Sequence, residues 1–241
     1  MAQPWASGPG EILQHGLSLL RKDSDKNRRL AILAIDNAVE LTIKTYLSLP
    51  RRVTGINLSR KDYLEISESF PRLLDALEQY AGDKLGGINL GEIEWYHRLR
   101  NELYHQGNGL TVDRDKVEVY AELAKLLFRN LFGFDVEIEE TEGHEVLGGF
   151  LAAWARLEQV SSALILKHGG IGSTGRVYQP IMAVRELEKL QLIDRRTVQE
   201  IEELRRIRNE VVHGMSDYKS AINRDRVVRL KEIVETLEKS L

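Results

Sequence analysis

Residues 92–105 read "EIEWYHRLRNELYH", and residues 200–213 read "EIEELRRIRNEVVH". Eight of the fourteen aligned positions are identical, and the two stretches lie 108 residues apart. At two further positions one aliphatic residue replaces another: Leu99 aligns with Ile207, and Leu103 aligns with Val211. Similarity of this length at one offset predicts that the chain contains an internal duplication.

The similarity continues on both sides of these stretches. "VDRDKV" at 112–117 resembles "INRDRV" at 222–227, and "ALEQY" at 76–80 resembles "ELEKL" at 186–190. Because the likeness extends over neighbouring segments, the duplicated unit is predicted to be larger than one helix.

Each copy is also preceded by a residue that can cap a helix. Asn89 lies three positions before Glu92, and Thr197 lies three positions before Glu200. This is the spacing of a capping box, in which the two side chains satisfy backbone N–H groups of the first turn. We therefore predict that a helix begins at equivalent positions in the two copies.

Most of the chain has the apolar spacing of amphipathic helices. Apolar residues recur at steps of three and four, and few segments alternate as strands do. The sequence therefore predicts an all-α protein made of two duplicated helical bundles, packed about a pseudo-two-fold axis as a pseudo-dimer. The segments predicted to be helical are 28–49, 70–82, 89–107, 113–132, 145–170, 179–193, 197–214 and 223–241.

A change of composition divides the two bundles. Residues 135–144 are acidic and break the helical pattern, so we predict a linker there, with a short strand at 134–140 as the alternative. The first bundle is then 11–134 and the second is 145–241. Residues 1–10, "MAQPWASGPG", are predicted to be a flexible N-terminal arm.

Composition excludes several classes of protein. The net charge of -3 and a pI near 6.1 argue against a generally basic nucleic-acid-binding surface, although a local basic cleft remains open. The chain has no cysteine, which excludes a disulfide framework and fits a reducing cytoplasm. No apolar run approaches the roughly 20 residues that span a bilayer, and no signal pattern begins the chain. We expect a cytoplasmic protein that does not enter the membrane.

Both copies end in Arg-Asn-Glu-x-x-His. Asn101 and His105 are four residues apart and share one helix face, as do Asn209 and His213. Each His stands just before a glycine that is expected to end the helix. A His at a helix C-terminus lies at the negative end of the helix dipole, which makes it a candidate acid or base.

Two such helix ends together could cleave RNA. Attack by the 2'-hydroxyl needs a base to take its proton, an acid for the 5'-oxygen leaving group, and positive charge beside the phosphorus. His105 and His213 can supply the first two, and Arg100 and Arg208 can supply the third. The products would be a 2',3'-cyclic phosphate and a 5'-hydroxyl, and the sequence does not say which His is the acid.

This motif, Arg-polar-x-x-x-His near a helix end in an all-α bundle, resembles the HEPN superfamily. Many members of that family are metal-independent endoribonucleases in toxin–antitoxin systems, phage defence, CRISPR effectors and RNA processing. Their active site forms where two motifs face each other. The resemblance implies a toxin or defence role, no cofactor, no metal ion, and one composite catalytic site of Arg100, Asn101, His105, Arg208, Asn209 and His213.

The resemblance also implies partners. RNA is the expected substrate, an antitoxin or another defence-system protein is a candidate partner, and the chain could form a homodimer. Toxins paired with a nucleotidyltransferase carry a Tyr two residues after the His, where this chain has Gly107 and Met215. Control through modification of that Tyr is therefore not expected.

Several repeated charged residues have two interpretations. Glu102 and Glu210 could orient the Arg or His side chains, or they could be ordinary exposed residues. Arg98, Arg205 and Arg206 could hold RNA phosphates, or they could simply solvate the helix. Glu40 and Glu158 could likewise support the site residues, or they could lie on a solvated helix face.

Three further readings of the sequence stay open. The double motif could be a polar network that fixes how the bundles dock, it could belong to a non-catalytic module that binds RNA, nucleotide or a defence protein, or it could belong to a purely structural scaffold within a larger defence complex. "GGIGSTGR" at 169–176 contains a nominal dinucleotide fingerprint, but it follows a helix instead of a strand, so we expect an interhelix loop. The remaining histidines show no metal-ligand spacing and are His15, His97, His144 and His168.

Overall fold

All regular structure in the described residues of this computed structural model is helical, which confirms the predicted all-α class. The chain divides into unit 1, Met1–Glu139, and unit 2, Glu140–Leu241. None of the helices in the described part combines the length and hydrophobicity needed to cross a bilayer. The structure describes residues 4–106, 111–136, 142–168 and 180–241.

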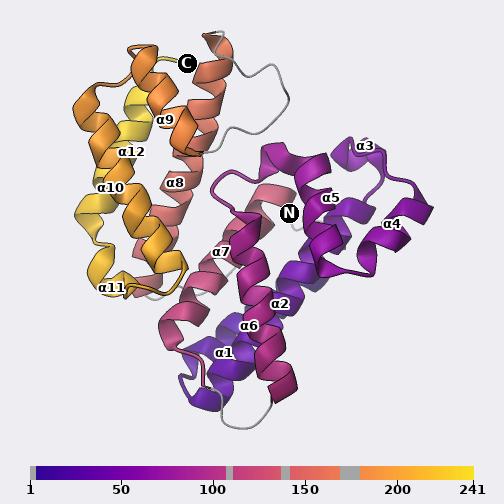
Figure 1. The fold of residues 1–241 in the computed structure, drawn as a ribbon. Coiled ribbons are helices and arrows are strands. Elements are labelled where there is room, and N and C mark those ends of the chain that lie inside the picture. The colour runs from indigo at the N-terminus through magenta and orange to yellow at the C-terminus, as the bar shows by residue number, and fades with distance from the viewer. Residues whose placement is uncertain (1–3, 107–110, 137–141, 169–179) are drawn as a thin grey trace. The chain divides into compact units, whose positions relative to one another are not determined.

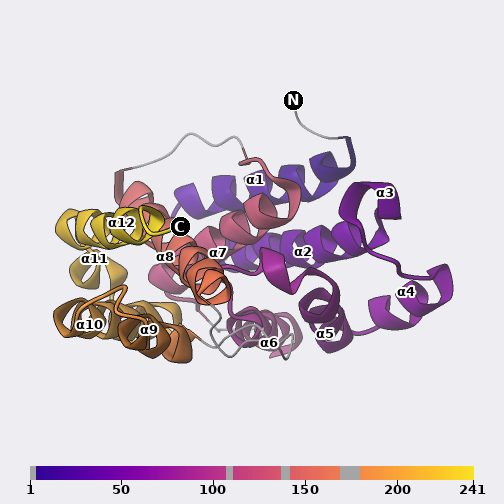
Figure 2. The ribbon, with the colours of Figure 1, turned by 90° about the horizontal axis from the view of Figure 1, so that it is seen from above.

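Unit 1 is built around the long helix α2, which packs against α1, α5, α6 and α7 (Figures 1 and 2). Ile32, Ile35, Val39 and Ile43 recur along α2 at steps of three and four and are buried. The elements of unit 1 are η1 (Pro4–Ala6), α1 (Ser7–Arg21), α2 (Asp25–Ser48), α3 (Arg51–Thr54), α4 (Arg60–Ser67), α5 (Phe70–Ala81), η2 (Gly82–Lys84), α6 (Leu90–Gln106) and α7 (Arg114–Phe132).

Unit 2 is built around α8, which packs against α9 and α12, while α10 packs against α9, α11 and α12 (Figure 1). Its core contains large side chains from α8, among them Phe150, Trp154 and Leu164. The elements are α8 (Glu142–Lys167), α9 (Pro180–Lys189), α10 (Arg195–Val212), α11 (Tyr218–Ala221) and α12 (Arg224–Glu238). The common ancestry of the two units stays a prediction.

The predicted arm at 1–10 differs from the structure. From Pro4 onward the chain is helical, and Pro9 and Gly10 are buried in α1. Glycine and proline obscured the helical pattern in the sequence. Of the predicted linker at 135–144, residues 137–141 lie outside the described residues, and α8 already begins at Glu142.

The predicted helix starts also need correction. The Asn89 side chain accepts a hydrogen bond from the Gly91 N–H at 2.9 Å, and the Glu92 N–H donates to the Asn89 backbone carbonyl at 3.0 Å. The N-cap of α10 lies three residues earlier than expected, because Asp194 caps the helix in place of Thr197 and accepts a hydrogen bond from the Thr197 N–H at 2.8 Å. The two motif helices therefore do not start at equivalent positions.

Close packing of α1 on α2 depends on Gly16. A Cβ atom placed there would lie 2.8 Å from Ile35 Cγ1 and 3.3 Å from the Ala31 carbonyl oxygen. We expect Gly16→Ala to destabilise unit 1, because overpacking costs about 1–3 kcal/mol, which exceeds the gain of about 1 kcal/mol in helix propensity. Urea denaturation followed by circular dichroism measures the change.

Gly10 provides the matched control on the same helix. A Cβ atom there would lie 3.6 Å from the nearest atom of Phe128, which is an ordinary contact. Gly10→Ala is therefore expected to leave stability unchanged or to raise it by up to about 1 kcal/mol. Equal effects of the two substitutions would contradict the role assigned to Gly16.

Candidate functional site

The first motif lies in the last turns of α6. Arg100 and Asn101 are half-buried, whereas Glu102 and His105 are exposed. The His105 ring lies edge-on to the ring of Tyr104, with centroids 5.4 Å apart. The motif therefore presents an exposed imidazole at a helix end, with its Arg and Asn one turn behind. Gly107, predicted to end this helix, lies outside the described residues.

A buried carboxylate on α2 holds Arg100 in place. Asp36 is 0% exposed, and its Oδ2 lies 2.9 Å from Arg100 Nε, close enough for an ion pair although the N–H is not aligned for a hydrogen bond. Arg100 Nη2 donates to Asn37 Oδ1 at 2.7 Å, and Nη1 donates to Asn101 Oδ1 at 2.8 Å. Each guanidinium nitrogen thus has a protein contact that orients it.

Two further side chains complete this network around Asp36. The Tyr120 hydroxyl donates to Asp36 Oδ1 at 2.7 Å, and His97 Nδ1 lies 2.9 Å from Asp36 Oδ2. Burial first, and then the Asp36 carboxylate, raise the pKa of Tyr120 well above its ordinary value, so its hydroxyl stays protonated as a donor. The ring of Phe70 stacks on His97 with centroids 3.8 Å apart. Helices α2, α5, α6 and α7 therefore all contribute to fixing Arg100.

The second motif lies at the end of α10. His213 is the exposed C-cap residue, its backbone N–H donates to the Asn209 carbonyl at 3.0 Å, and Gly214 follows with φ of +64°. The predicted end of this helix is therefore confirmed. At the opposite end, hydrogen bonds from Thr197 lower the pKa of the Asp194 carboxyl, which keeps the cap ionised.

The two motif arginines make the same hydrogen bond, each to the Asn that follows it, but they differ in burial. Arg208 Nη1 donates to Asn209 Oδ1 at 3.4 Å, as Arg100 does to Asn101. Arg208, however, is only 5% exposed, whereas Arg100 is half-buried. In unit 2 the motif arginine thus offers little surface to a ligand.

A shallow hollow of about 370 Å³ lies beside the second motif, within unit 2. Three arginines and two glutamates contribute to its lining, so its formal charge is positive. Arg208 is absent from the described residues that line it. These are Arg185, Glu202, Arg205, Arg206, Asn209, Glu210, His213 and Met215.

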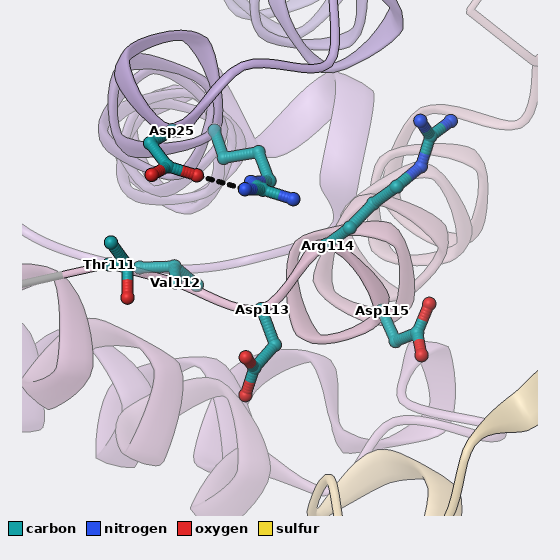
Figure 3. A pocket seen from close by; sticks show the side chains of 7 residues that line it. Asp25, Thr111, Val112, Asp113, Arg114 and Asp115 are labelled. Carbon is teal, nitrogen blue, oxygen red and sulfur yellow. Dashed lines mark hydrogen bonds and ion pairs between the residues drawn. The ribbon is translucent and has the colours of Figure 1, made fainter.

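Unit 1 has a hollow of similar size at the start of α7, shown in Figure 3. Its arginines are already paired with carboxylates: Arg28 with Asp25, and Arg114 with Glu118 at 2.6 Å. Arg114 also pairs with Asp23 at 2.5 Å. The positive charge in this hollow is therefore already neutralised by the protein.

Asp36, Glu40 and His97 each place one potential ligand atom within 4.8 Å of the others. Asp36 already faces the Arg100 guanidinium, and Glu40 pairs with Lys44 at 2.6 Å on its own helix. A metal ion would have to share these oxygens with resident cations. We therefore interpret the cluster as part of the charge network and not as a metal site.

The other candidate residues have local partners. Arg98 pairs with Glu94, and the Trp154 indole N–H donates to Glu158 Oε1 at 2.8 Å. Glu210 pairs with Arg206 at 3.7 Å and accepts from the Ser216 hydroxyl at 3.2 Å. The glycine-rich segment 169–176 and the His144 side chain lie outside the described residues.

Sequence reasoning missed Asp36, Asn37, His97 and Tyr120. One signal could have found the first of them. Asp36 interrupts the apolar run "AILAIDNAVEL" on a helix whose neighbouring residues are buried. An acid in such a run needs a buried partner, and Arg100 is that partner.

Comparisons of the chain with protein-family models, with curated proteins and with solved structures found no match. The resemblance to the HEPN superfamily therefore rests on the motif residues.

Proposed function

We propose that the protein is a metal-independent endoribonuclease of the HEPN type, with both motifs contributing to one catalytic site. One observation carries the proposal: each unit ends its motif helix with an exposed His that follows a bonded Arg–Asn pair. A site built from one motif helix would have a single His and would lack either the general acid or the general base, whereas two motif helices supply both.

The proposed reaction uses the RNA's own 2'-hydroxyl as the nucleophile. One of His105 and His213 takes the 2'-hydroxyl proton while the 2'-oxygen forms a bond to phosphorus. The other His gives its proton to the 5'-oxygen as the bond from phosphorus to that oxygen breaks. The products are a 2',3'-cyclic phosphate and a 5'-hydroxyl, and no metal-bound water is needed for the attack.

Arg100 is the proposed electrostatic partner of the reacting phosphate. A guanidinium carries five N–H donors, of which one on Nη1 donates to Asn101 and one on Nη2 donates to Asn37. The second N–H on each of these two nitrogens is available to a phosphate oxygen. Because the ion pair with Asp36 already fixes the side chain, little reorganisation is needed when charge develops in the transition state.

Incubation with RNA in the presence of a chelator tests this function. Structured and single-stranded RNA are both offered, and the 3' ends of the fragments are analysed. We expect cleavage with cyclic phosphate ends, and none of an RNA whose 2'-hydroxyls are methylated, because the nucleophile is then absent. Cleavage of the methylated RNA, or fragments with 3'-hydroxyl ends, would contradict the proposed chemistry.

A second candidate function is a non-catalytic module that binds RNA, nucleotide or a partner protein in a toxin or defence system. The burial of Arg208 favours it, because a buried motif arginine serves packing as readily as chemistry. RNA that is bound but stays intact under all the conditions above would support this alternative over the nuclease.

A further inference from the structure

We propose that Arg185 and Arg205 form a phosphate-binding subsite in unit 2, and that its ligand is a phosphodiester of single-stranded RNA beside the cleaved one. The inference rests on the proposed function. It assigns the phosphate contacts of unit 2 to two arginines outside the Arg-Asn-x-x-x-His pattern, in place of the buried Arg208.

The position of the hollow supports this assignment. Glu202, Arg206, Asn209 and the C-cap residue His213 follow one another along α10 at steps of four, three and four, so they lie on one face of the helix, and Arg205 lies beside Arg206 at the edge of that face. Arg185 reaches the same hollow from α9, which packs against α10. A strand held here would pass Asn209 and His213, two of the proposed catalytic residues.

Unneutralised charge is the second observation. Among the described residues, neither the Arg185 side chain nor the Arg205 side chain has an ion-pair or hydrogen-bond partner, although Arg205 is half-buried. Arg206, by contrast, has Glu210 at 3.7 Å. In unit 1 the arginines of the comparable hollow are paired with carboxylates. A guanidinium that has no carboxylate partner is suited to bidentate contact with a phosphate.

The lining also favours an unpaired nucleotide over a small anion. Met215 is 77% exposed at the hollow and offers a large apolar surface next to the arginines. Single-strand binding sites combine positive charge along the backbone with apolar or aromatic surface for the bases. A free base can lie on the thioether only where the strand is not paired.

Binding of a short single-stranded RNA with methylated 2'-hydroxyls tests the subsite, because this probe cannot undergo the proposed cleavage. We measure its dissociation constant by fluorescence anisotropy over a range of salt concentrations. Arg185→Ala and Arg205→Ala are each expected to weaken binding about tenfold, the effect of one charge-assisted contact. Together they should reduce the slope of log affinity against log salt by about 1.4, since each phosphate contact on a single strand contributes about 0.7.

Two variants on α10 serve as controls. Arg196→Ala removes the same charge from an exposed residue that pairs with Glu200, away from the hollow, and should leave binding unchanged. Glu202→Gln removes a negative charge from the hollow and should tighten binding. Circular dichroism establishes that each variant is folded.

The inference fails if the Arg185/Arg205 double variant binds like the wild type, or if Arg196→Ala weakens binding as much. The nuclease proposal is judged separately, on the cleavable RNA. Binding that depends on these arginines, with no cleavage, would retain the subsite and reject the nuclease. Cleavage of RNA, together with binding that does not depend on these arginines, would retain the nuclease and reject the subsite.

Discussion

Single replacement of His105 or His213 by Ala is expected to lower the rate of RNA cleavage by about a hundredfold to ten-thousandfold, the usual contribution of a general acid or base. Each His is proposed to act in the same reaction, so the loss of either one leaves the step without half of its proton transfer. Single-turnover cleavage of a labelled RNA in chelator measures the effect.

Comparison of the single and double variants distinguishes one shared site from two independent sites. With one site, the His105→Ala/His213→Ala double variant should be little worse than either single variant, because residues that act as a unit have non-additive effects. With two sites, each single variant would keep about half of the wild-type rate. His15→Ala, which changes an exposed His outside both motifs, is the control and should cleave at the wild-type rate.

A mixture of the two single variants tests whether the two motifs of one site come from the same chain or from two copies of it. Cleavage recovered on mixing would mean that one site combines motifs from different copies, as in a homodimer. A mixture as inactive as its components would mean that both motifs act within a chain. If both single variants keep the full wild-type rate, the catalytic role of the motif histidines is wrong.

Removal of the Asp36 carboxylate is expected to be the most destabilising of these substitutions. Asp36→Ala would leave Arg100 without its buried counter-ion and Tyr120 without its acceptor. Breaking a buried ion pair from one side costs about 3–5 kcal/mol, and we expect about 3 kcal/mol because water can reach the half-buried guanidinium. Urea denaturation gives the free energy of unfolding, and hydrogen exchange in α2 and α6 locates the change.

Two further substitutions on α2 make this measurement specific. Asp36→Asn keeps the shape and one acceptor, so we expect a smaller loss, about 1–2 kcal/mol. Glu40→Ala removes a partly exposed carboxylate that pairs with Lys44 on its own helix, and should change stability by no more than about 0.5 kcal/mol. An Asp36→Ala protein as stable as the Glu40→Ala protein would show that the buried network contributes little.

Loss of this network should also reduce cleavage, because Arg100 would no longer be fixed. Folded Asp36→Asn protein at low temperature separates this effect from unfolding. If its RNA affinity stays close to the wild-type value while the single-turnover rate falls, the loss of rate comes from the changed position of Arg100 and not from unfolding of the bundle.

The helices themselves could be predicted well from local pattern. The apolar spacing of 28–49 and 113–132 predicted α2 and α7 within a few residues, since burial of one face imposes that period on the sequence. Helix α1 was missed, because Gly10 and Gly16 look like helix breakers, and only the close packing of α1 on α2 at Gly16 shows why a glycine is needed there. The start of α10 was misplaced because Asp194 and Thr197 are both good caps.

Sequence by itself determined that the chain is helical and that two Arg-Asn-x-x-x-His motifs stand near helix ends, because helical period and capping depend on residues a few positions apart. Only the tertiary structure decided which side chains meet across helices. It paired Arg100 with Asp36 from α2, buried Arg208, and brought Arg185 from α9 to the same hollow as Arg205. The two arginines of one repeated motif therefore have different surroundings, since each is set by the crossing of helices distant in sequence.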